Sequence, residues 1–456
     1  MKMSKNIFRA YDIRGIYNEE FDDEFAYYLG KAYGSTLHEL GKTKTLIAHD
    51  NRISSPSIYK NLIKGIIDTG INVVSLGLVT TPMYYFASNY LNINCGIMVT
   101  ASHNPKEYNG FKISYNGLYN AYGEDVYKLY EKILSNNFKE GNGTITEENI
   151  TIPYINLIKK NIKIGNRKLK VVYDCGNGTT SIIAKEIFSN LGNITFIPTF
   201  DINDGTFPNH HPDPSVEENL SSLKQTVIDT HADVGIAFDG DGDRVGVVSE
   251  KGQMIDIDKY MIIIWRDIVN KITDKRALYD VKCSKALSDE LDKLQIKKTE
   301  YRTGNSYMKA KMVEDKFPFG GELSGHVFFQ DKFPGYDDGI YAGLRLIEIL
   351  SNTNKTTEEL LSGINKYYNT KELKVTIEDT KKEELIKRVG EYCKEKNYTT
   401  NTIDGVKVLF ETGFALIRAS NTGPNITLRY EAKTEEELAK IIKEFTDLID
   451  KIKKEL

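Results

Sequence analysis

Asp239, Asp241 and Asp243 alternate with glycines in the sequence DGDGDR, directly after the apolar run 234–238. Carboxylates at positions i, i+2 and i+4 project to one side of an extended backbone, and the glycines let that backbone bend around an ion. Without a cation the three charges would repel one another, and hard divalent cations prefer oxygen ligands. The spacing therefore predicts a divalent metal site, and Arg244 adds an anion-binding group beside it.

Two other interpretations of this segment are less favoured. A calcium-binding EF-hand is suggested by Glu250, which falls at the twelfth position counted from Asp239. However, Arg244 occupies the sixth position, where an EF-hand needs glycine, and both flanks have strand character. A solvated acidic turn fits poorly with the apolar flanks and the strict spacing. We therefore expect magnesium next to a phosphate group.

Ser102 lies in the sequence TASHNP, after the strand-like run 95–99. A serine at a strand end exposes its hydroxyl to a ligand, although the same sequence also suits a capped turn. A hydrolase nucleophile is disfavoured because no G-x-S-x-G surrounds Ser102 and the adjacent His103 is not in the usual base geometry. Lys112, ten residues on, would neutralise the charge of a phosphate.

Two further polar segments suit the two ends of a sugar phosphate. Glu322 and Ser324, in GGELSGH, would share one side of an extended chain and suit vicinal sugar hydroxyls. A glycine-rich loop with incidental polar residues is an equally good interpretation. Arg418 opens the sequence RASNTGP, whose guanidinium, hydroxyl and amide groups would hold a phosphate, together with Arg429 on the next strand. An ordinary hairpin turn is the alternative, and the arginine pair favours the phosphate site.

The elements that carry these segments alternate between strand-like runs and helical periodicity over about three quarters of the chain. Such alternation favours layered α/β domains with parallel or mixed sheets, in which ligands bind where strands end. The expected strands are 45–49, 72–76, 95–100, 169–174, 233–238 and 277–281, and the expected helices are 124–135, 180–191, 258–271 and 284–294.

From about residue 371 the pattern changes to that of a smaller α+β domain with an antiparallel sheet. A strand is followed there by helix 382–396, strands 406–410, 414–419 and 425–431, and helix 434–454. The expected domains are 1–150 with Ser102, 151–252 with the aspartates, 253–367 with the sugar-binding residues, and 368–456 with the phosphate-binding residues.

Composition narrows the class of protein further. The net charge is −4, with no long block of one sign, which argues against nucleic-acid and membrane-surface partners. The N-terminus lacks the apolar stretch of a signal peptide, and no apolar run is long enough to span a bilayer. Cys95, Cys175, Cys283 and Cys393 are widely scattered, which disfavours disulfides and a zinc site. We therefore expect a cytoplasmic protein.

Together and in this order, these segments resemble the active-site loops of the α-D-phosphohexomutases, from residue 8 to residue 431. The sequences FRAYDIRG, HDNRISSP, HHPDP and DVKC are similar to further signatures of that family. The resemblance implies four domains around a deep central cleft: three α/β domains with mixed sheets and a smaller α+β domain. Each domain would contribute one active-site loop.

The resemblance also implies roles for single residues. Ser102 would carry a phosphoryl group and would bind Mg²⁺ with Asp239, Asp241 and Asp243. The residues assisting the transfer would be His103, Lys112, Arg14, Arg244 and His326. The residues binding the substrate would be Tyr11, Lys282, Asn305, Glu322, Ser324, Arg418, Ser420, Asn421, Thr422 and Arg429.

The activity implied is reversible phosphoryl transfer between the 1- and 6-positions of a hexose phosphate through a hexose 1,6-bisphosphate. Lys112 and His103 are both candidates for the general base, because they lie close to Ser102 in the sequence. RASNTGP resembles the phosphomannomutase/phosphoglucomutase group, whereas phosphoglucosamine mutases usually have glycine at the place of Asn421. Asn305 departs from the group, which commonly has histidine there. The alternatives are a phosphoglucosamine mutase and a non-catalytic sugar-phosphate-binding protein.

Overall fold

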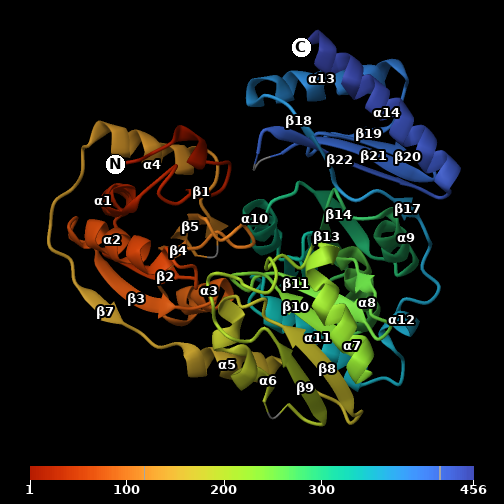
Figure 1. The fold of residues 1–456 in the computed structure, drawn as a ribbon, viewed down its shortest axis with the longest axis horizontal. Coiled ribbons are helices and arrows are strands. Elements are labelled where there is room, and N and C mark those ends of the chain that lie inside the picture. Colours follow the sequence, from red (N-terminus) through yellow and green to blue (C-terminus); the bar gives the residue numbers. More distant parts are fainter. Residues whose placement is uncertain (118, 190, 421–422) are drawn as a thin grey trace.

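The computed structural model describes residues 1–117, 119–189, 191–420 and 423–456 of the chain. Within this part of the chain the strands form four sheets that follow one another along the sequence (Figure 1). The first three sheets combine parallel and antiparallel pairs and alternate with helices. The pairs of the last sheet are all antiparallel. The predicted fold class is confirmed.

The first sheet has the strand order β1-β5-β4-β2-β3-β7, with β6 paired to β5. Asp22 and Thr80 cap two of its helices by accepting hydrogen bonds from the backbone N–H groups of Phe25 and Met83. The strands are β1 (Ile13–Ile16), β2 (Lys44–His49), β3 (Asn72–Leu78), β4 (Gly96–Val99), β5 (Tyr108–Asn116), β6 (Tyr119–Asn120) and β7 (Ile145–Glu147), and the helices are α1 (Asp23–Glu39), α2 (Ser55–Ile67), α3 (Thr81–Tyr90) and α4 (Glu124–Ser135), preceded by a short 3₁₀ helix at Lys5–Ile7.

The second sheet has the order β12-β11-β10-β8-β9, and its central strand β10 is buried along its whole length. This complete burial explains the unbroken apolar run before DGDGDR. The strands are β8 (Leu169–Asp174), β9 (Ile194–Thr199), β10 (Val234–Phe238), β11 (Val245–Ser249) and β12 (Met254–Ile255). The helices are α5 (Thr151–Asn161), α6 (Ala184–Phe188) and α7 (Ser221–Thr230), with 3₁₀ helices at Thr179–Ile182 and Glu217–Leu220.

The third sheet has the order β14-β13-β15-β16. One of its following helices, α11, packs against β10 and β11 and so joins the second and third domains. The strands are β13 (Arg276–Asp280), β14 (Lys297–Tyr301), β15 (Phe319–Gly321) and β16 (Val327–Phe329). The helices are α8 (Ile257–Ile268), α9 (Lys285–Lys293), α10 (Asn305–Asp315), α11 (Gly339–Ser351) and α12 (Thr357–Leu360).

The last sheet has the order β17-β22-β21-β20-β19, with β18 paired to β22. Helices α13 and α14 bury Leu385 and Phe445 in a core that is separate from the larger core of the first three domains. The strands are β17 (Tyr368–Asn369), β18 (Leu373–Thr376), β19 (Thr400–Asn401), β20 (Val406–Phe410), β21 (Gly413–Ala419) and β22 (Asn425–Ala432), and the helices are α13 (Asp379–Glu395) and α14 (Glu435–Glu455).

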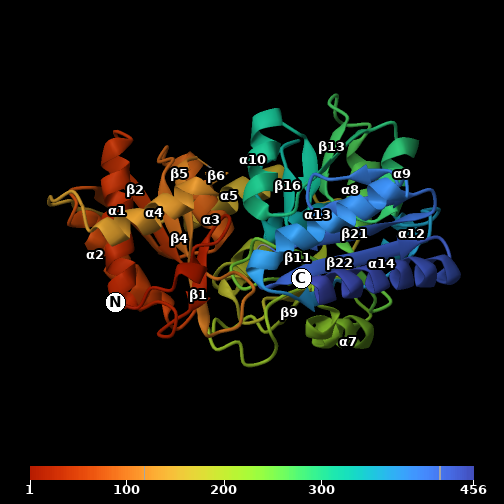
Figure 2. The ribbon, with the colours of Figure 1, turned by 90° about the horizontal axis from the view of Figure 1, so that it is seen from above.

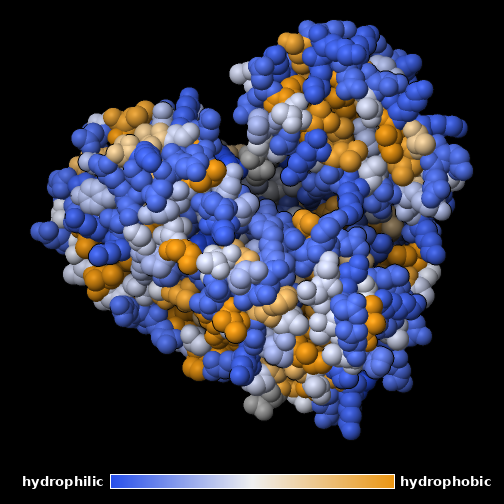
Figure 3. All heavy atoms as spheres, in the orientation of Figure 1, coloured by the Kyte–Doolittle hydropathy of each residue, from blue (hydrophilic) through white to orange (hydrophobic). Residues whose placement is uncertain are grey.

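The domains surround a hollow. The first domain forms one end of the molecule, and the fourth lies over the second and third when the molecule is seen from above (Figure 2). The space-filling view shows the surface hollowed between the first domain and the fourth (Figure 3). In the described part of the chain no helix combines the length and the apolar character that crossing a membrane requires.

Most expected elements are present within a few residues, including the strand 406–410 and the helix 124–135. The expected helix 180–191 is wrong in extent. It is a 3₁₀ helix, Thr179–Ile182, followed by the short helix α6. The backbone N–H of Thr179 donates to the carbonyl oxygen of Gly240 at 2.8 Å, so a contact with the DGDGDR segment fixes the start of this element.

Candidate active site

Ser102 follows strand β4, and its backbone has a positive φ of 50°. This left-handed conformation costs a serine roughly 1–2 kcal/mol, so surrounding contacts must hold it. A buried arginine, Arg52, provides them. Its guanidinium donates hydrogen bonds to the backbone oxygens of Ser102 (2.8 Å), Asn104 (2.6 Å), Pro105 (2.6 Å) and Tyr108 (3.0 Å). Arg52 therefore fixes the loop that presents the serine.

The DGDGDR segment is a turn between β10 and β11, so the extended backbone expected from its spacing is wrong. The backbone N–H groups of Gly242 and Arg244 close the turn by donating to Oδ1 of Asp239, both at 3.1 Å. A Cβ atom at Gly240 would lie 2.5 Å from the carbonyl oxygen of Ser102. Glycine at this position therefore allows the turn to approach the serine loop.

The three aspartates converge beside the serine hydroxyl. Ser102 Oγ donates to Oδ2 of Asp239 at 2.7 Å, and oxygens of Asp239, Asp241 and Asp243 lie within 4.8 Å of one another, all fully buried. Burial, with the neighbouring charges of Asp241 and Asp243, raises the pKa of Asp239 well above its usual value. Among the described residues, Oδ1 of Asp241 and Oδ1 of Asp243 have no hydrogen-bond partner. A divalent cation would satisfy these oxygens, so the residues present fit a metal ion.

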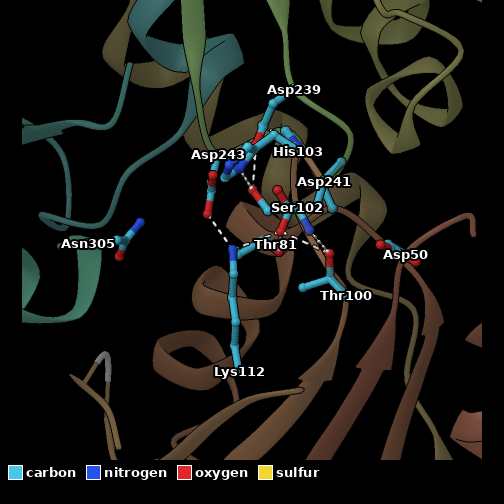
Figure 4. Close-up of polar contacts among 12 residues, drawn as sticks. Asp50, Thr81, Thr100, Ser102, His103, Lys112, Asp239, Asp241, Asp243 and Asn305 are labelled. Atoms are coloured by element: carbon cyan, nitrogen blue, oxygen red, sulfur yellow. Dashed lines mark hydrogen bonds and ion pairs between the residues drawn. The ribbon is translucent and has the colours of Figure 1, made fainter. Parts of the chain in front are cut away.

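Lys112, on β5, is the cation nearest to this cluster. Its Nζ donates to Oδ2 of Asp241 at 2.8 Å and to Oδ2 of Asp243 at 2.6 Å (Figure 4). Burial lowers the pKa of Lys112, but the two carboxylates outweigh it and hold the pKa well above its usual value. The hydroxyls of Thr81 and Thr100 also donate to Asp241, at 2.6 and 3.1 Å. Lys112 is therefore fixed as a charged group.

His103 and Arg14 lie on the cleft side of the serine. Nδ1 of His103 is 3.3 Å from Ser102 Oγ. Burial lowers the pKa of His103 well below its usual value, and Arg244 and Arg14 add to this effect, so the imidazole is neutral near pH 7. Arg14, on β1, forms a 2.6 Å ion pair with Asp12, which fixes the direction of its guanidinium.

His326 links the second domain to a buried carboxylate of the third. Nε of Arg244 donates to Nε2 of His326 at 3.0 Å. Because Nε2 accepts, the imidazole proton is on Nδ1 and is donated to Oδ2 of Asp337 at 2.7 Å. Lys309 and the side-chain amide of Asn305 also contact this carboxylate. Burial alone would raise the pKa of Asp337, but Lys309 and His326 hold it below its usual value.

The GGELSGH segment is a tight turn between β15 and β16, and the extended conformation expected for it is wrong. The backbone N–H of Glu322 donates to the carbonyl oxygen of His326 at 2.8 Å, and that of Gly325 donates to Glu322 at 3.1 Å. Even so, Glu322 and Ser324 both line the cleft. Oε1 of Glu322 accepts from the backbone N–H of Gly304 at 2.6 Å, which fixes the direction of the carboxylate.

Lys282, Arg418 and Arg429 form a group of cations between the third and fourth domains, which we call the distal cation group. Arg418 and Arg429 stand on the paired strands β21 and β22, and Lys282 follows β13. Nε of Arg418 donates to Asp404 at 2.8 Å, and Nζ of Lys282 lies 2.7 Å from Glu372. All three cations are at least nine-tenths buried.

One cleft of about 510 Å³ connects these features. It is lined by the predicted residues Tyr11, Arg14, Ser102, His103, Lys112, Arg244, Lys282, Asn305, Glu322, Ser324, His326, Arg418, Ser420 and Arg429. The three aspartates lie fully buried next to Ser102 and Lys112 rather than in its lining. The predicted residues Asn421 and Thr422 lie outside the described residues.

Sequence reasoning missed four residues of this region: Arg52, Lys309, Asp337 and Glu372. Arg52 belongs to the HDNRISSP segment, so the family resemblance was a signal that could have singled it out. Lys309 lies in α10, where a lysine normally faces solvent, yet it is fully buried.

Fold and cleft together define the class of α-D-phosphohexomutases, and comparisons with known proteins agree. Four sequence models of phosphoglucomutase/phosphomannomutase domains match the chain: α/β/α domain I at residues 5–140, domain II at 153–252, domain III at 256–367 and the C-terminal domain at 372–448. The chain belongs to the phosphoglucomutase/phosphomannomutase family.

Individual relatives are similar over nearly the whole chain. A phosphomannomutase/phosphoglucomutase of Pseudomonas aeruginosa is 40% identical over 436 residues, which cover 96% of this chain and 94% of the relative. A phosphoglucomutase of Neisseria gonorrhoeae is 36% identical, covering 98% and 97% of the two chains. The crystal structure of a phosphoglucomutase/phosphomannomutase family protein from Burkholderia thailandensis superposes with a TM-score of 0.92 at 36% identity, covering 99% and 98%.

Proposed function

We propose that this phosphohexomutase interconverts hexose 1-phosphates and hexose 6-phosphates, with mannose or glucose as the sugar, by two phosphoryl transfers through Ser102. The observation that carries the assignment to Ser102 is its hydroxyl, which donates to Asp239 at 2.7 Å in a cleft lined by cations. A binding protein would not need a serine in a left-handed conformation beside three buried carboxylates.

In the first transfer, the bond between phosphorus and Ser102 Oγ breaks while a bond forms from phosphorus to the 6-hydroxyl oxygen of a hexose 1-phosphate. The hydroxyl proton passes to a base in the cleft, and the product is a hexose 1,6-bisphosphate. The bisphosphate then turns around, and its 1-phosphoryl group returns to Ser102 in the same manner. Because each transfer only exchanges phosphate esters, the cycle is reversible.

Magnesium held by Asp239, Asp241, Asp243 and Ser102 would supply charge neutralisation at the transferring phosphoryl group. Lys112 adds a fixed positive charge from β5, and Arg14 and Arg244 add guanidinium groups from the first and second domains. His103 is neutral near pH 7 and next to Ser102, which favours it over the charged Lys112 as the group that accepts a proton.

The remaining cleft residues would hold the part of the substrate that does not react. Glu322 and Ser324 would accept hydrogen bonds from sugar hydroxyls. The distal cation group, with Ser420, Asn421 and Thr422, would bind the second phosphate. We assign these tasks to domains 1–150, 151–252, 253–367 and 368–456, in the order serine, metal, sugar and phosphate.

A substrate panel tests this function. Purified enzyme with MgCl₂ and a trace of hexose 1,6-bisphosphate should convert glucose 1-phosphate and mannose 1-phosphate to the 6-phosphates, followed by ³¹P NMR. Turnover of glucosamine 1-phosphate alone would replace the assignment with a phosphoglucosamine mutase. No turnover of any of the three would reject the function.

A further inference from the structure

Lys282 and Glu372 form an ion pair across the boundary between the third and fourth domains. Nζ of Lys282 lies 2.7 Å from Oε1 of Glu372, and both residues line the cleft. Lys282 follows β13 of the third domain, whereas Glu372 lies in the short connection between β17 and β18 of the fourth. The side chain of Lys282 is 8% exposed and that of Glu372 is 35% exposed, so solvent and ligands reach the carboxylate from the cleft.

Glu372 is a carboxylate on which all three members of the distal cation group act. Lys282, with smaller contributions from Arg429 and Arg418, lowers the pKa of Glu372 to about 2 against the effect of burial. Arg418 also has Asp404 as a partner, but in the described part of the chain its Nη2 and the Nε of Arg429 are buried without a hydrogen-bond partner. The distal cation group therefore keeps two buried N–H donors that no described protein acceptor satisfies.

An anion with more oxygens than a carboxylate satisfies such a group better. A phosphate offers several acceptor oxygens and about two negative charges near pH 7, whereas Glu372 offers one charge. A phosphate dianion and the Glu372 carboxylate cannot both contact Lys282 without strong repulsion, because two like charges a few ångströms apart in a partly buried site are screened only weakly by solvent.

We propose that Glu372 is an internal competitor of the substrate: its carboxylate holds Lys282 in the free enzyme and is displaced when the non-reacting phosphate of a hexose phosphate binds the distal cation group. This inference rests on the proposed function and adds to it a residue that sets the affinity of the phosphate site. Glu372 is a positioning residue, because it acts through Lys282 and does not touch the substrate.

The competition has two consequences for the reaction. First, the competition lowers the affinity of the distal cation group for the phosphate. The bisphosphate intermediate can then dissociate from this group and turn around. Second, displacement of Glu372 breaks an ion pair between the third and fourth domains, so phosphate binding is coupled to the freedom of the fourth domain to move. A site without the competitor binds phosphate more tightly and turns the intermediate more slowly.

The direct test measures phosphate affinity without catalysis. Calorimetric titration of inorganic phosphate into Glu372→Gln should give a Kd about tenfold lower than that of the wild-type enzyme, because one repelling charge is removed. Glu372→Asp keeps the charge and should bind as the wild type does. Glu218→Gln is the matched control, since Glu218 also lines the cleft but pairs with the exposed Lys371 at 3.0 Å; its Kd should not change.

A Kd of Glu372→Gln within twofold of the wild-type value, or an equal change in Glu218→Gln, would overturn the proposal. The unfolding temperature of each variant is measured in the same buffer. A cooperative transition above the titration temperature shows that the variant is folded during the titration.

Steady-state kinetics then separates this inference from the proposed function. With glucose 1-phosphate, Glu372→Gln should lower KM and also lower kcat, whereas damage to folding would raise KM or leave it unchanged. If neither the wild-type enzyme nor Glu372→Gln turns over any hexose phosphate, the proposed function is wrong. The phosphate titration would still show whether Glu372 competes with phosphate.

Discussion

Arg52 Nη2 donates a hydrogen bond to the backbone oxygen of Ser102 at 2.8 Å, and Arg52 is only 1% exposed to solvent. The same guanidinium binds three further carbonyl oxygens of the loop that begins at Ser102. One buried side chain thus fixes the backbone at Ser102 and in the loop that follows it. The orientation of Ser102 is built before any substrate arrives.

Arg52→Lys should therefore damage catalysis beyond its effect on stability. An ammonium group cannot reach four carbonyl oxygens, so the loop loses several hydrogen bonds, and kcat should fall about 100-fold with a loss of about 3 kcal/mol in the free energy of unfolding. Arg167→Lys is the matched control. Arg167 also binds backbone oxygens, those of Thr353 and Lys355, but it is not among the residues that line the cleft.

The expected result for Arg167→Lys is a similar loss of stability with kcat within about twofold of the wild type. Urea unfolding and initial rates at saturating substrate check both variants. Equal losses of kcat in the two variants would show that Arg52 acts on stability alone.

Asp239→Asn should separate metal binding from the stability of the metal-free protein. Burial makes the charged form of Asp239 costly, and asparagine can still accept from the backbone N–H groups of Gly242 and Arg244. In EDTA the variant should be more stable than the wild type by about 1 kcal/mol. Addition of MgCl₂ should raise the unfolding temperature of the wild type and of Asp229→Asn, an exposed control, but not of Asp239→Asn. If MgCl₂ still raised the unfolding temperature of Asp239→Asn, the assignment of Asp239 to a magnesium site would be wrong.

The buried carboxyl group of Asp338 should make the folded protein less stable as the pH rises. Burial raises the pKa of this carboxyl to about 7, above the value near 3.9 expected in the unfolded chain. Between these values the folded protein binds a proton that the unfolded chain releases, so stability falls as pH rises from 4 to 7 and is flat above. Asp338→Asn mimics the protonated form and should remove this slope, gaining about 4 kcal/mol relative to the wild type between pH 4 and pH 8.

Urea midpoints of both proteins at the two pH values measure the gain for Asp338→Asn. The variant keeps an acceptor for the backbone N–H of Tyr341, which now bonds Asp338 at 2.9 Å. An identical pH dependence in wild type and variant would show that Asp338 is already charged near pH 5.

Asn305 lines the cleft and contacts Asp337 and His326, at the position where the family group commonly has histidine. Asn305→His introduces a larger ring that can carry charge, and it should change the ratio of kcat/KM for mannose and glucose 1-phosphate by more than about threefold. The magnesium requirement should stay as it is. Asn369→His, at another lining position, is the control. An unchanged ratio in Asn305→His would remove this residue from substrate selection.

Local sequence was sufficient where burial follows a simple pattern. The fully buried strand β10 was predictable from its apolar run, and the cluster of carboxylates from the charges of DGDGDR. The backbone conformation of these segments was harder to predict than their chemistry. Both DGDGDR and GGELSGH are turns, because contacts of Asp239 and Glu322 with nearby backbone groups close them. The spacing of the residues along the sequence does not reveal those contacts.

Residues that act through long-range contacts escaped prediction for the same reason. Lys309 and Lys311 stand two positions apart in α10, yet Lys309 is fully buried against Asp337 while Lys311 pairs with Asp315 near the surface. Helical periodicity cannot tell them apart, because the partner of Lys309 comes from a segment 28 residues further on. Glu372 likewise gains its role from Lys282, which is 90 residues away.

We propose that Ser102 carries the phosphoryl group that is transferred. In a single turnover, enzyme phosphorylated with ³²P is mixed with unlabelled hexose 1-phosphate. The phosphorylated chain is heavier than the unphosphorylated one by about 80 Da. We expect the label to be on the peptide containing Ser102, to be absent from Ser102→Ala, and to move to hexose 1,6-bisphosphate at least as fast as kcat. A label that stays on the protein during turnover, or that Ser102→Ala acquires equally, would contradict it.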